Sequence, residues 1–381
     1  MRILLVGDYP PDPRLGSTKV LAKLQQEFQA LGHNCDVLLS DALGDRPRDA
    51  RLRQALGPVI ALRAVRRVIR ERGRYDVIDV ASAEGRWIAR WRGGLLRGTA
   101  VISRSNGLEH LNYKRLIDDH DAGLTSKPWT RRLFHPLVRL TQVSAAARFA
   151  DRLLLLNNAE RRFAVSRGWK HEDAVDVVAH GVSTRFLADA PRVDAPRGRG
   201  ILFCGSWTPV KGVAYLAAAF SMLAEAGAST RLTVLGGAVP ASEIMAAFAP
   251  IARPLVTVLE RAPEDEVMQA YRSHDVLAWP STYEGFGMVL VEAMSQRLPV
   301  VATPVGCAQD LVVDGGTGLV VPPRDPHALA AALSRMLADP RLRLRCATAA
   351  FDSVRDMTWT NTAKRTLNVY SRALARYGHV A

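Results

Sequence analysis

Short runs of valine, isoleucine and leucine alternate with longer helical patterns along almost the whole chain, and no other feature constrains the fold as strongly. We expect strands at 2–6, 35–39, 76–80, 100–103, 152–156 and 175–178, and again at 200–204, 231–235, 255–259, 275–279 and 299–302. Helical periodicity indicates helices at 18–31, 213–226, 264–272, 287–296 and 326–338. Apolar strands that alternate with helices are typical of parallel sheets covered on both faces. The pattern therefore predicts an α/β fold.

A stretch rich in proline and charge divides the chain near residues 189–198. Its two prolines and its glycine predict a linker, and a new apolar strand follows it at once. A chain of 381 residues is long enough for two domains. We therefore expect α/β domains at 1–188 and 200–358, joined by a linker at 189–199. Ligands are expected in the cleft that the carboxyl ends of both sets of strands face.

The composition predicts a cytoplasmic protein. No apolar run reaches the roughly 18 residues that a membrane span needs. The first eight residues are too short and too soon interrupted for a signal peptide, and they are better interpreted as a buried strand. The four cysteines do not pair at CxxC spacing, so we interpret them as buried or incidental thiols: Cys35, Cys204, Cys307 and Cys346.

Positive charge is concentrated in the first half of the chain. Residues 1–190 hold 32 basic and 21 acidic residues, a net charge of +11, whereas residues 191–381 hold 19 and 16, a net charge of +3. This excess suggests an anionic partner, such as a phosphorylated acceptor or an acidic membrane surface. Only seven of the 51 basic residues are lysine, so an arginine-biased genome is an alternative explanation.

Residues 51–74 are both apolar and rich in arginine, and Pro58 interrupts their first part. A basic amphipathic helix of this kind can lie on an anionic membrane. The alternative is the solvated face of an ordinary helix in an α/β domain.

Two glutamates, Glu284 and Glu292, lie in a segment where a strand runs through a glycine-containing loop into a helix. The glycines let the backbone approach a ligand, and the start of the helix offers amides and a positive dipole end to a diphosphate. Glu292 lies about one turn into the helix, and its side chain can reach back toward the same ligand. A carboxylate suits the vicinal hydroxyls of a ribose. The alternative is that Glu284 is solvated and Glu292 is salt-bridged.

The segment 280–294 resembles the Glu-x7-Glu signature of retaining glycosyltransferases of the GT-B fold, family 4 or group 1. Residues 298–303 and 314–321 match the run that follows the second glutamate in that family. In residues 203–213, Lys211 matches the lysine that contacts the donor diphosphate, whereas Ser206 stands where the family has an arginine. The resemblance implies two Rossmann-like domains, with the closing helix at 359–381 packed back onto the first.

The resemblance assigns most donor contacts to the second half. It implies that Glu284 grips the transferred sugar and that Lys211 stabilises the departing diphosphate. The full set of donor-binding residues that it implies is Gly16, Ser17, Gly205, Ser206, Lys211, Gly236, Arg261, Gly285, Phe286, Gly287, Met288, Val289 and Glu292.

The first half matches the family more loosely. Leu15, Gly16 and Ser17 resemble the glycine loop that faces the donor phosphates, and residues 32–37 and 177–183 match two further stretches. Many relatives carry a His-Gly pair that faces the reacting sugar. Here Asn106 stands at the histidine position and His110 follows one turn later, with Glu109 as a competitor. The alternative for His110 is a surface histidine.

The resemblance implies transfer of a hexose or related sugar from a nucleoside-diphosphate donor to a hydroxyl, with retention and without a metal or other cofactor. The acceptor would be a precursor of a cell-envelope polysaccharide, a glycolipid or a natural-product glycoside, and could be lipid-linked or phosphorylated.

The Asp-His-Asp run at 119–121 has no buried strand before it, and we interpret it as a solvated loop within 118–126. The alternatives are a nucleotide-sugar 2-epimerase on the same fold and a basic nucleic-acid-binding protein, although no nucleic-acid-binding motif is found. A dinucleotide oxidoreductase is disfavoured because the first strand is not followed by GxGxxG.

Overall fold

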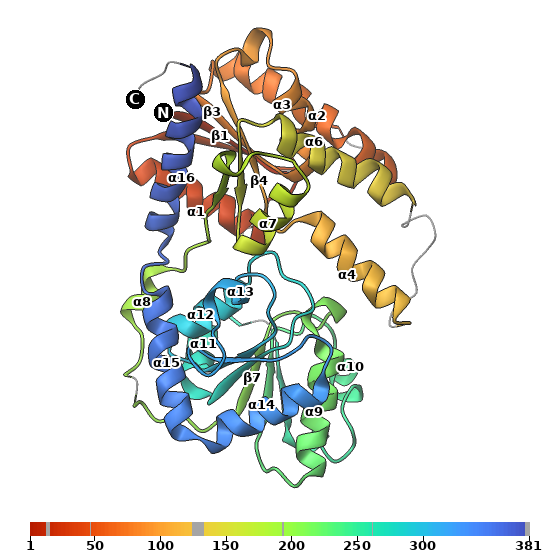
Figure 1. The fold of residues 1–381 in the computed structure, drawn as a ribbon, viewed down its shortest axis with the longest axis vertical. Coiled ribbons are helices and arrows are strands. Elements are labelled where there is room, and N and C mark those ends of the chain that lie inside the picture. Colours follow the sequence, from red (N-terminus) through yellow and green to blue (C-terminus); the bar gives the residue numbers. More distant parts are fainter. Residues whose placement is uncertain (13–15, 46, 124–132, 193, 261, 378–381) are drawn as a thin grey trace. The chain divides into compact units, whose positions relative to one another are not determined.

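The computed structural model describes residues 1–12, 16–45, 47–123, 133–192, 194–260 and 262–377. The chain divides into two compact units, residues 1–181 with 359–381 and residues 182–358 (Figure 1). Each unit is built on a six-stranded sheet in which neighbouring strands run parallel. The predicted α/β fold is therefore confirmed.

The first unit carries its strands in the order β2-β1-β3-β4-β5-β6. These strands are β1 (Arg2–Val6), β2 (Asn34–Leu38), β3 (Val77–Ala81), β4 (Ala100–Arg104), β5 (Arg152–Leu155) and β6 (Val175–Val177). Its α-helices are α1 (Gly16–Ala30), α2 (Ala50–Arg72), α3 (Gly85–Arg90), α4 (Glu109–Asp121), α6 (Thr141–Phe149), α7 (Asn158–Ser166) and α16 (Trp359–Leu374). A π-helical segment, His135–Leu140, precedes α6.

The last helix, α16, belongs to the first unit although the second unit precedes it in sequence. It packs on α1 and β4, and the Tyr370 hydroxyl donates a hydrogen bond of 2.5 Å to the buried Asp79 carboxylate. Thr362 Oγ1 donates to the carbonyl of Ala179 over 3.0 Å. Its apolar stripe, including Leu367 and Leu374, is buried, as the period of the sequence requires.

The second unit carries its strands in the order β12-β11-β10-β7-β8-β9. These are β7 (Ile201–Cys204), β8 (Leu232–Leu235), β9 (Val256–Leu259), β10 (Val276–Trp279), β11 (Val300–Ala302) and β12 (Leu319–Val320). Its α-helices are α8 (Thr184–Ala188), α9 (Val213–Glu225), α10 (Ala241–Ala246), α11 (Glu264–Ser273), α12 (Met288–Ser295), α13 (Ala308–Leu311), α14 (Pro326–Ala338) and α15 (Pro340–Val354). The central strands β7 and β10 are almost fully buried, which explains why they consist of apolar residues.

The second unit begins earlier in the sequence than the expected domain at 200–358, because residues 182–199 pack onto it. Phe186 of α8 is buried against Tyr271, with ring centroids 6.2 Å apart. In the expected linker, the Arg197 guanidinium donates hydrogen bonds to five backbone carbonyls between residues 271 and 297. This arginine holds residues near the end of α11 to those after α12, a role that the proline-rich composition did not indicate.

Two local expectations were wrong. Residues 118–121 form the end of α4 rather than a solvated loop, and the rest of that expected loop lies partly outside the described residues. Asp119 is 5% exposed and pairs with Arg115 over 2.6 Å, an i,i+4 pair that supports the helix through this polar stretch. Pro58 does not interrupt α2, which runs through it. There the Gln142 amide donates to the carbonyl of Ala55, next to the carbonyl that the proline leaves without its helical donor.

Candidate functional site

The second unit has a topological switch point between its neighbouring strands β10 and β7. The chain leaves β7 through α9 toward β8, and it leaves β10 through α12 toward β11, on the other side. Both helices begin at the carboxyl ends of these adjacent strands. Ligands of open α/β sheets bind at such a point, and helix N-termini attract phosphates.

Both helices begin at a glycine in the left-handed region, Gly212 with φ 70° and Gly287 with φ 107°. Neither glycine has a side chain that could cap the first-turn amides. A Cβ atom on Gly212 would lie 1.9 Å from the carbonyl oxygen of Pro280, and one on Gly287 would lie 2.6 Å from the Trp279 ring. Glycine is therefore required at both positions, and the two helix starts are left for a ligand to satisfy.

The loops before α9 and α12 are joined directly by hydrogen bonds. The amide of Thr282 donates to the carbonyl of Val210 over 2.8 Å, and its hydroxyl donates to the same carbonyl over 3.2 Å. The loop after β8 joins them, because the amide of Trp207 donates to the carbonyl of Gly237 over 2.6 Å. These bonds hold the loops before α9 and α12 together as one platform.

Lys211 and Glu284 meet on this platform. Lys211 Nζ donates to Glu284 Oε1 over 2.6 Å, and Ser281 Oγ donates to the same oxygen over 2.9 Å. The lysine side chain is 26% exposed and the glutamate side chain 10% exposed. The sequence predicted a role for each residue but not their contact. The ammonium is held in place by the carboxylate that the sequence assigned to the sugar.

Glu284 is also positioned by the loop after β11. Gly306, with φ 52°, passes so close that a Cβ atom there would lie 2.8 Å from Glu284 Cβ and 2.4 Å from the carbonyl oxygen of Phe286. The amide of Cys307 donates to that same carbonyl over 2.7 Å. The loop after β11 thus holds the segment that contains Glu284 and Gly285.

Glu292 lies in α12 and is half-buried. The hydroxyl of Tyr271 donates to Glu292 Oε2 over 3.1 Å, and it also contacts Cys204 Sγ over 3.6 Å. Tyr271 is fully buried, and burial raises its pKa well above the usual value, so that the hydroxyl keeps its proton. One oxygen of Glu292 is therefore fixed by a neutral donor.

The other predicted donor residues that the structure describes in this unit lie after β7, after β8 and at the start of α12. Gly205, whose φ is 140°, follows β7 and precedes Ser206, and Gly236, with φ 83°, follows β8. Met288 and Val289 form the first turn of α12. Arg261 lies outside the described residues.

In the first unit, Gly16 and Ser17 open α1, and Leu15 lies outside the described residues. Asn106 follows β4, and its Nδ2 donates to the hydroxyl of Tyr9 over 2.8 Å. His110 packs against Trp169, with ring centroids 4.7 Å apart, and its Nε2 lies 3.1 Å from the hydroxyl oxygen of Ser144. Burial lowers its pKa to about 4. The structure thus gives Asn106 and His110 different surroundings, one at the strand end and one in an aromatic cluster.

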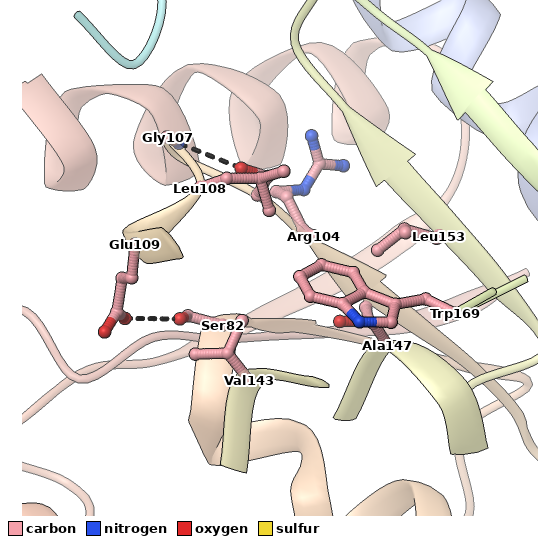
Figure 2. A pocket seen from close by; sticks show the side chains of 11 residues that line it. Ser82, Arg104, Gly107, Leu108, Glu109, Val143, Ala147, Leu153 and Trp169 are labelled. Carbon is pink, nitrogen blue, oxygen red and sulfur yellow. Dashed lines mark hydrogen bonds between the residues drawn. The ribbon is translucent and has the colours of Figure 1, made fainter. Parts of the chain in front are cut away.

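A polar cluster that the sequence did not reveal lies at the carboxyl ends of β1, β3 and β4. Arg139, from the π-helical segment, forms ion pairs with Glu84 over 2.7 Å and with Glu109 over 2.9 Å. Ser82, which has a φ of 52°, donates to Glu109 over 2.6 Å. Figure 2 shows this bond beside a cavity of about 10 Å³ that Ser82 and Glu109 help to line.

Comparisons with known proteins agree with this geometry. Residues 198–339 match the family described as glycosyl transferases group 1. The chain is 33% identical over 350 residues to a D-inositol 3-phosphate glycosyltransferase of Kineococcus radiotolerans, and the match spans 79% of this chain and 80% of that relative. This chain belongs to the group 1 glycosyltransferases. The resemblance expected from the sequence is confirmed.

Other relatives of this glycosyltransferase agree. A D-inositol 3-phosphate glycosyltransferase of Streptosporangium roseum is 28% identical over 330 residues, spanning 81% of this chain and 72% of that relative. Sucrose-phosphate synthase from Thermosynechococcus elongatus superposes with a TM-score of 0.78 at 20% identity, covering 98% of this chain and 99% of its own. Anabaena Alr3699/HepE, solved with UDP and glucose, gives a TM-score of 0.69 at 16% identity and covers 98% and 100%. These structures show the GT-B fold.

Several residues that position the site of this glycosyltransferase were missed by sequence reasoning. Tyr271 lies inside α11 and reads as an ordinary core aromatic residue. Ser281 and Gly306 lie in the loops that follow β10 and β11, so their place after strand ends was the available signal. The same signal applies to Tyr9 after β1 and Ser82 after β3.

Proposed function

We propose that this glycosyltransferase moves a hexose or related sugar from a nucleoside-diphosphate sugar to an acceptor hydroxyl, with retention of anomeric configuration. The observation that carries the proposal is the pair of uncapped, glycine-started helices at the switch point, with Lys211 beside them. A diphosphate needs this combination of backbone amides and a cation.

The proposed mechanism stabilises the departing diphosphate electrostatically. Negative charge on the diphosphate grows as the sugar leaves, so a nearby ammonium and two helix N-termini favour the transition state over the ground state. Lys211 would then move from its bond with Glu284 to the diphosphate or share its donors between them, since an ammonium has three. Glu284 would accept sugar hydroxyls with its remaining lone pairs, and Glu292 would accept those of the ribose.

We propose that no metal ion is needed, because Lys211 and the helix ends supply the positive charge. Turnover that is unchanged after chelation with EDTA is the expected result. Activity lost with EDTA and restored by Mg²⁺ or Mn²⁺ would overturn this part of the proposal.

The decisive experiment has two steps. A thermal-shift screen of nucleoside diphosphates and nucleotide sugars identifies the donor, because a specific ligand raises the melting temperature. NMR of the first-formed product with that donor then reports the anomeric configuration. Inversion would contradict retention, and donor loss without an acceptor would favour the epimerase, which the family comparison does not support.

We also propose that the acceptor belongs to cell-envelope polysaccharide, glycolipid or natural-product glycoside synthesis and that the first unit contacts anionic membranes. Among the described residues, no helix is both long and apolar enough to cross a bilayer. Four large leucines are nevertheless exposed on α2 and just before or within the π-helical segment that packs against it. They are Leu52 (55% exposed), Leu56 (44%), Leu133 (55%) and Leu137 (68%). Exposed arginines such as Arg51 and Arg53 flank them, a composition that suits an anionic lipid surface.

A further inference from the structure

The polar cluster of the first unit lies where a parallel sheet presents its ligands. Three neighbouring strands contribute to it at their carboxyl ends: Tyr9 follows β1, Ser82 and Glu84 follow β3, and Asn106 and Glu109 follow β4. These residues belong to the first unit, whereas Lys211, Glu284 and Glu292 belong to the second. If the chain transfers sugars as proposed, this edge is available to the acceptor.

Carboxylates of the cluster balance the positive charge of Arg139. The Nη1 atom of Arg139 donates to Glu84 over 2.7 Å, while Nε and Nη2 each donate to Glu109 over 2.9 Å. Burial alone would raise the pKa of Glu109, but the guanidinium and the Ser82 hydroxyl outweigh it, and the pKa is lowered. Glu109 therefore stays ionised and balances Arg139, before any charge on Glu84 is counted.

A second arginine of this edge is also paired with a carboxylate. Arg104 ends β4, is 1% exposed and pairs with Asp79 over 2.5 Å. The hydroxyl of Tyr370, in α16, donates a hydrogen bond to the same Asp79 carboxylate. The charge of each arginine is therefore balanced by a carboxylate, although the buried Nη1 atom of Arg104 has no hydrogen-bond partner among the described residues.

The cluster instead offers hydrogen-bond acceptors. Asn106 Oδ1 is buried and has no hydrogen-bond partner among the described residues. The Glu109 carboxylate is the most exposed member of the ion-pair triad, with 25% of its side chain accessible, against 16% for Arg139 and 4% for Glu84. Hydroxyl groups donate to such atoms, whereas a phosphate dianion brings only further acceptors and negative charge.

We propose that this edge selects an uncharged, hydroxyl-rich acceptor and discriminates against a phosphorylated one, with Glu109 as the residue that sets this specificity by masking Arg139. The proposal rests on the proposed glycosyl transfer. It separates this chain from its relatives, which are named for D-inositol 3-phosphate.

The test removes the negative charge of Glu109 while keeping the size of its side chain. Glu109→Gln leaves Arg139 paired only with Glu84 and turns the net charge of the cluster more positive. Asp118→Asn is the matched control, because it removes a carboxylate from the same helix at an exposed ion pair with Lys114. Calorimetry is carried out on the full chain with its donor site saturated by a nucleoside diphosphate. It measures binding of inorganic phosphate, D-inositol 3-phosphate and myo-inositol.

The wild type and Asp118→Asn are expected to bind inorganic phosphate and the phosphorylated polyol weakly, and Glu109→Gln to bind both about tenfold tighter or more, since one nearby negative charge is gone. Equal phosphate affinity in the wild type and Glu109→Gln would overturn the proposal, as would a wild type that favours D-inositol 3-phosphate over myo-inositol. Failure of the proposed function is distinguishable, because it appears as the absence of any nucleoside diphosphate that raises the melting temperature.

Discussion

Gly212→Ala should separate the loops before α9 and α12 and weaken donor binding. The new Cβ atom would lie 1.9 Å from the carbonyl oxygen of Pro280, where ordinary contact begins near 3.4 Å, so one loop must retreat by about 1.5 Å. A left-handed φ in alanine costs about 1–2 kcal/mol. Loss of the bond from Thr282 to Val210 adds about 0.5–1.5 kcal/mol. We therefore expect the free energy of unfolding to fall by about 1.5–3.5 kcal/mol and kcat/KM to fall about a hundredfold.

Gly227→Ala is the matched control for that variant. Gly227 has a similar φ of 81° in the same unit, but a Cβ atom there would meet nothing within 4 Å. It should lose only the conformational term of about 1–2 kcal/mol and keep full affinity for nucleoside diphosphates. Chemical denaturation measures the stability of both variants, and calorimetry with UDP, ADP and GDP measures their binding. Wild-type affinity in Gly212→Ala, or an equal loss of affinity in both variants, would refute the reasoning.

Four further predictions follow from named residues. Lys211→Ala should lower turnover about a hundredfold or more, and near-normal steady-state rates would make the lysine structural. Glu292→Ala should raise the donor KM about tenfold or more without unfolding the chain; an unchanged KM would remove its ribose role. Leu52→Glu should weaken sedimentation with anionic liposomes, and wild-type binding should itself fall as salt rises; vesicle binding that ignores both changes argues against this surface. Burial and, secondarily, Arg104 lower the pKa of His180 to about 3, so the unfolded chain takes up a proton below pH 6.5 that the native chain does not. The free energy of unfolding should therefore decrease between pH 6.5 and 4 by up to about 1.4 kcal/mol per pH unit from this group, and it should decrease less in His180→Asn. Chemical denaturation at several pH values measures this, and the same change of unfolding free energy with pH in both proteins would contradict it.

The strands could be predicted because each is a short apolar run that a doubly covered sheet requires. The expected strand at 2–6 is β1 itself, and the expected helix at 326–338 is α14 itself. β12 was not predicted, since two residues are too few for any periodicity. The end of α4 was missed because its stability comes from ion pairs between successive turns, and these are invisible when polar residues are simply counted as loop.

The donor site could be predicted only as separate motifs. Glu284 and Glu292 stood out through the strand-loop-helix pattern, and Lys211 through family resemblance. Their partners could not be predicted, because Lys211 and Glu284 are 73 residues apart and meet only when β7 and β10 pair. Tyr271 likewise reaches Glu292 from a different helix. Contacts of this kind depend on strand order, which local periodicity does not contain.

The polar cluster of the first unit escaped prediction for a related reason. Arg139 lies in a segment whose apolar residues suggest nothing but packing, and Glu84 is buried in a 3₁₀ turn after β3. Among many arginines, none is singled out by sequence as the one enclosed by two carboxylates. The charge balance of this cluster is therefore a property of the fold alone.

Amide hydrogen exchange with and without a saturating nucleoside diphosphate tests the central claim most directly. The account predicts that binding slows exchange at the first turns of α9 and α12, at Val213, Ala214, Met288 and Val289, because these amides donate to the diphosphate. A nucleoside diphosphate that binds while both helix starts exchange at their unliganded rates would contradict the account.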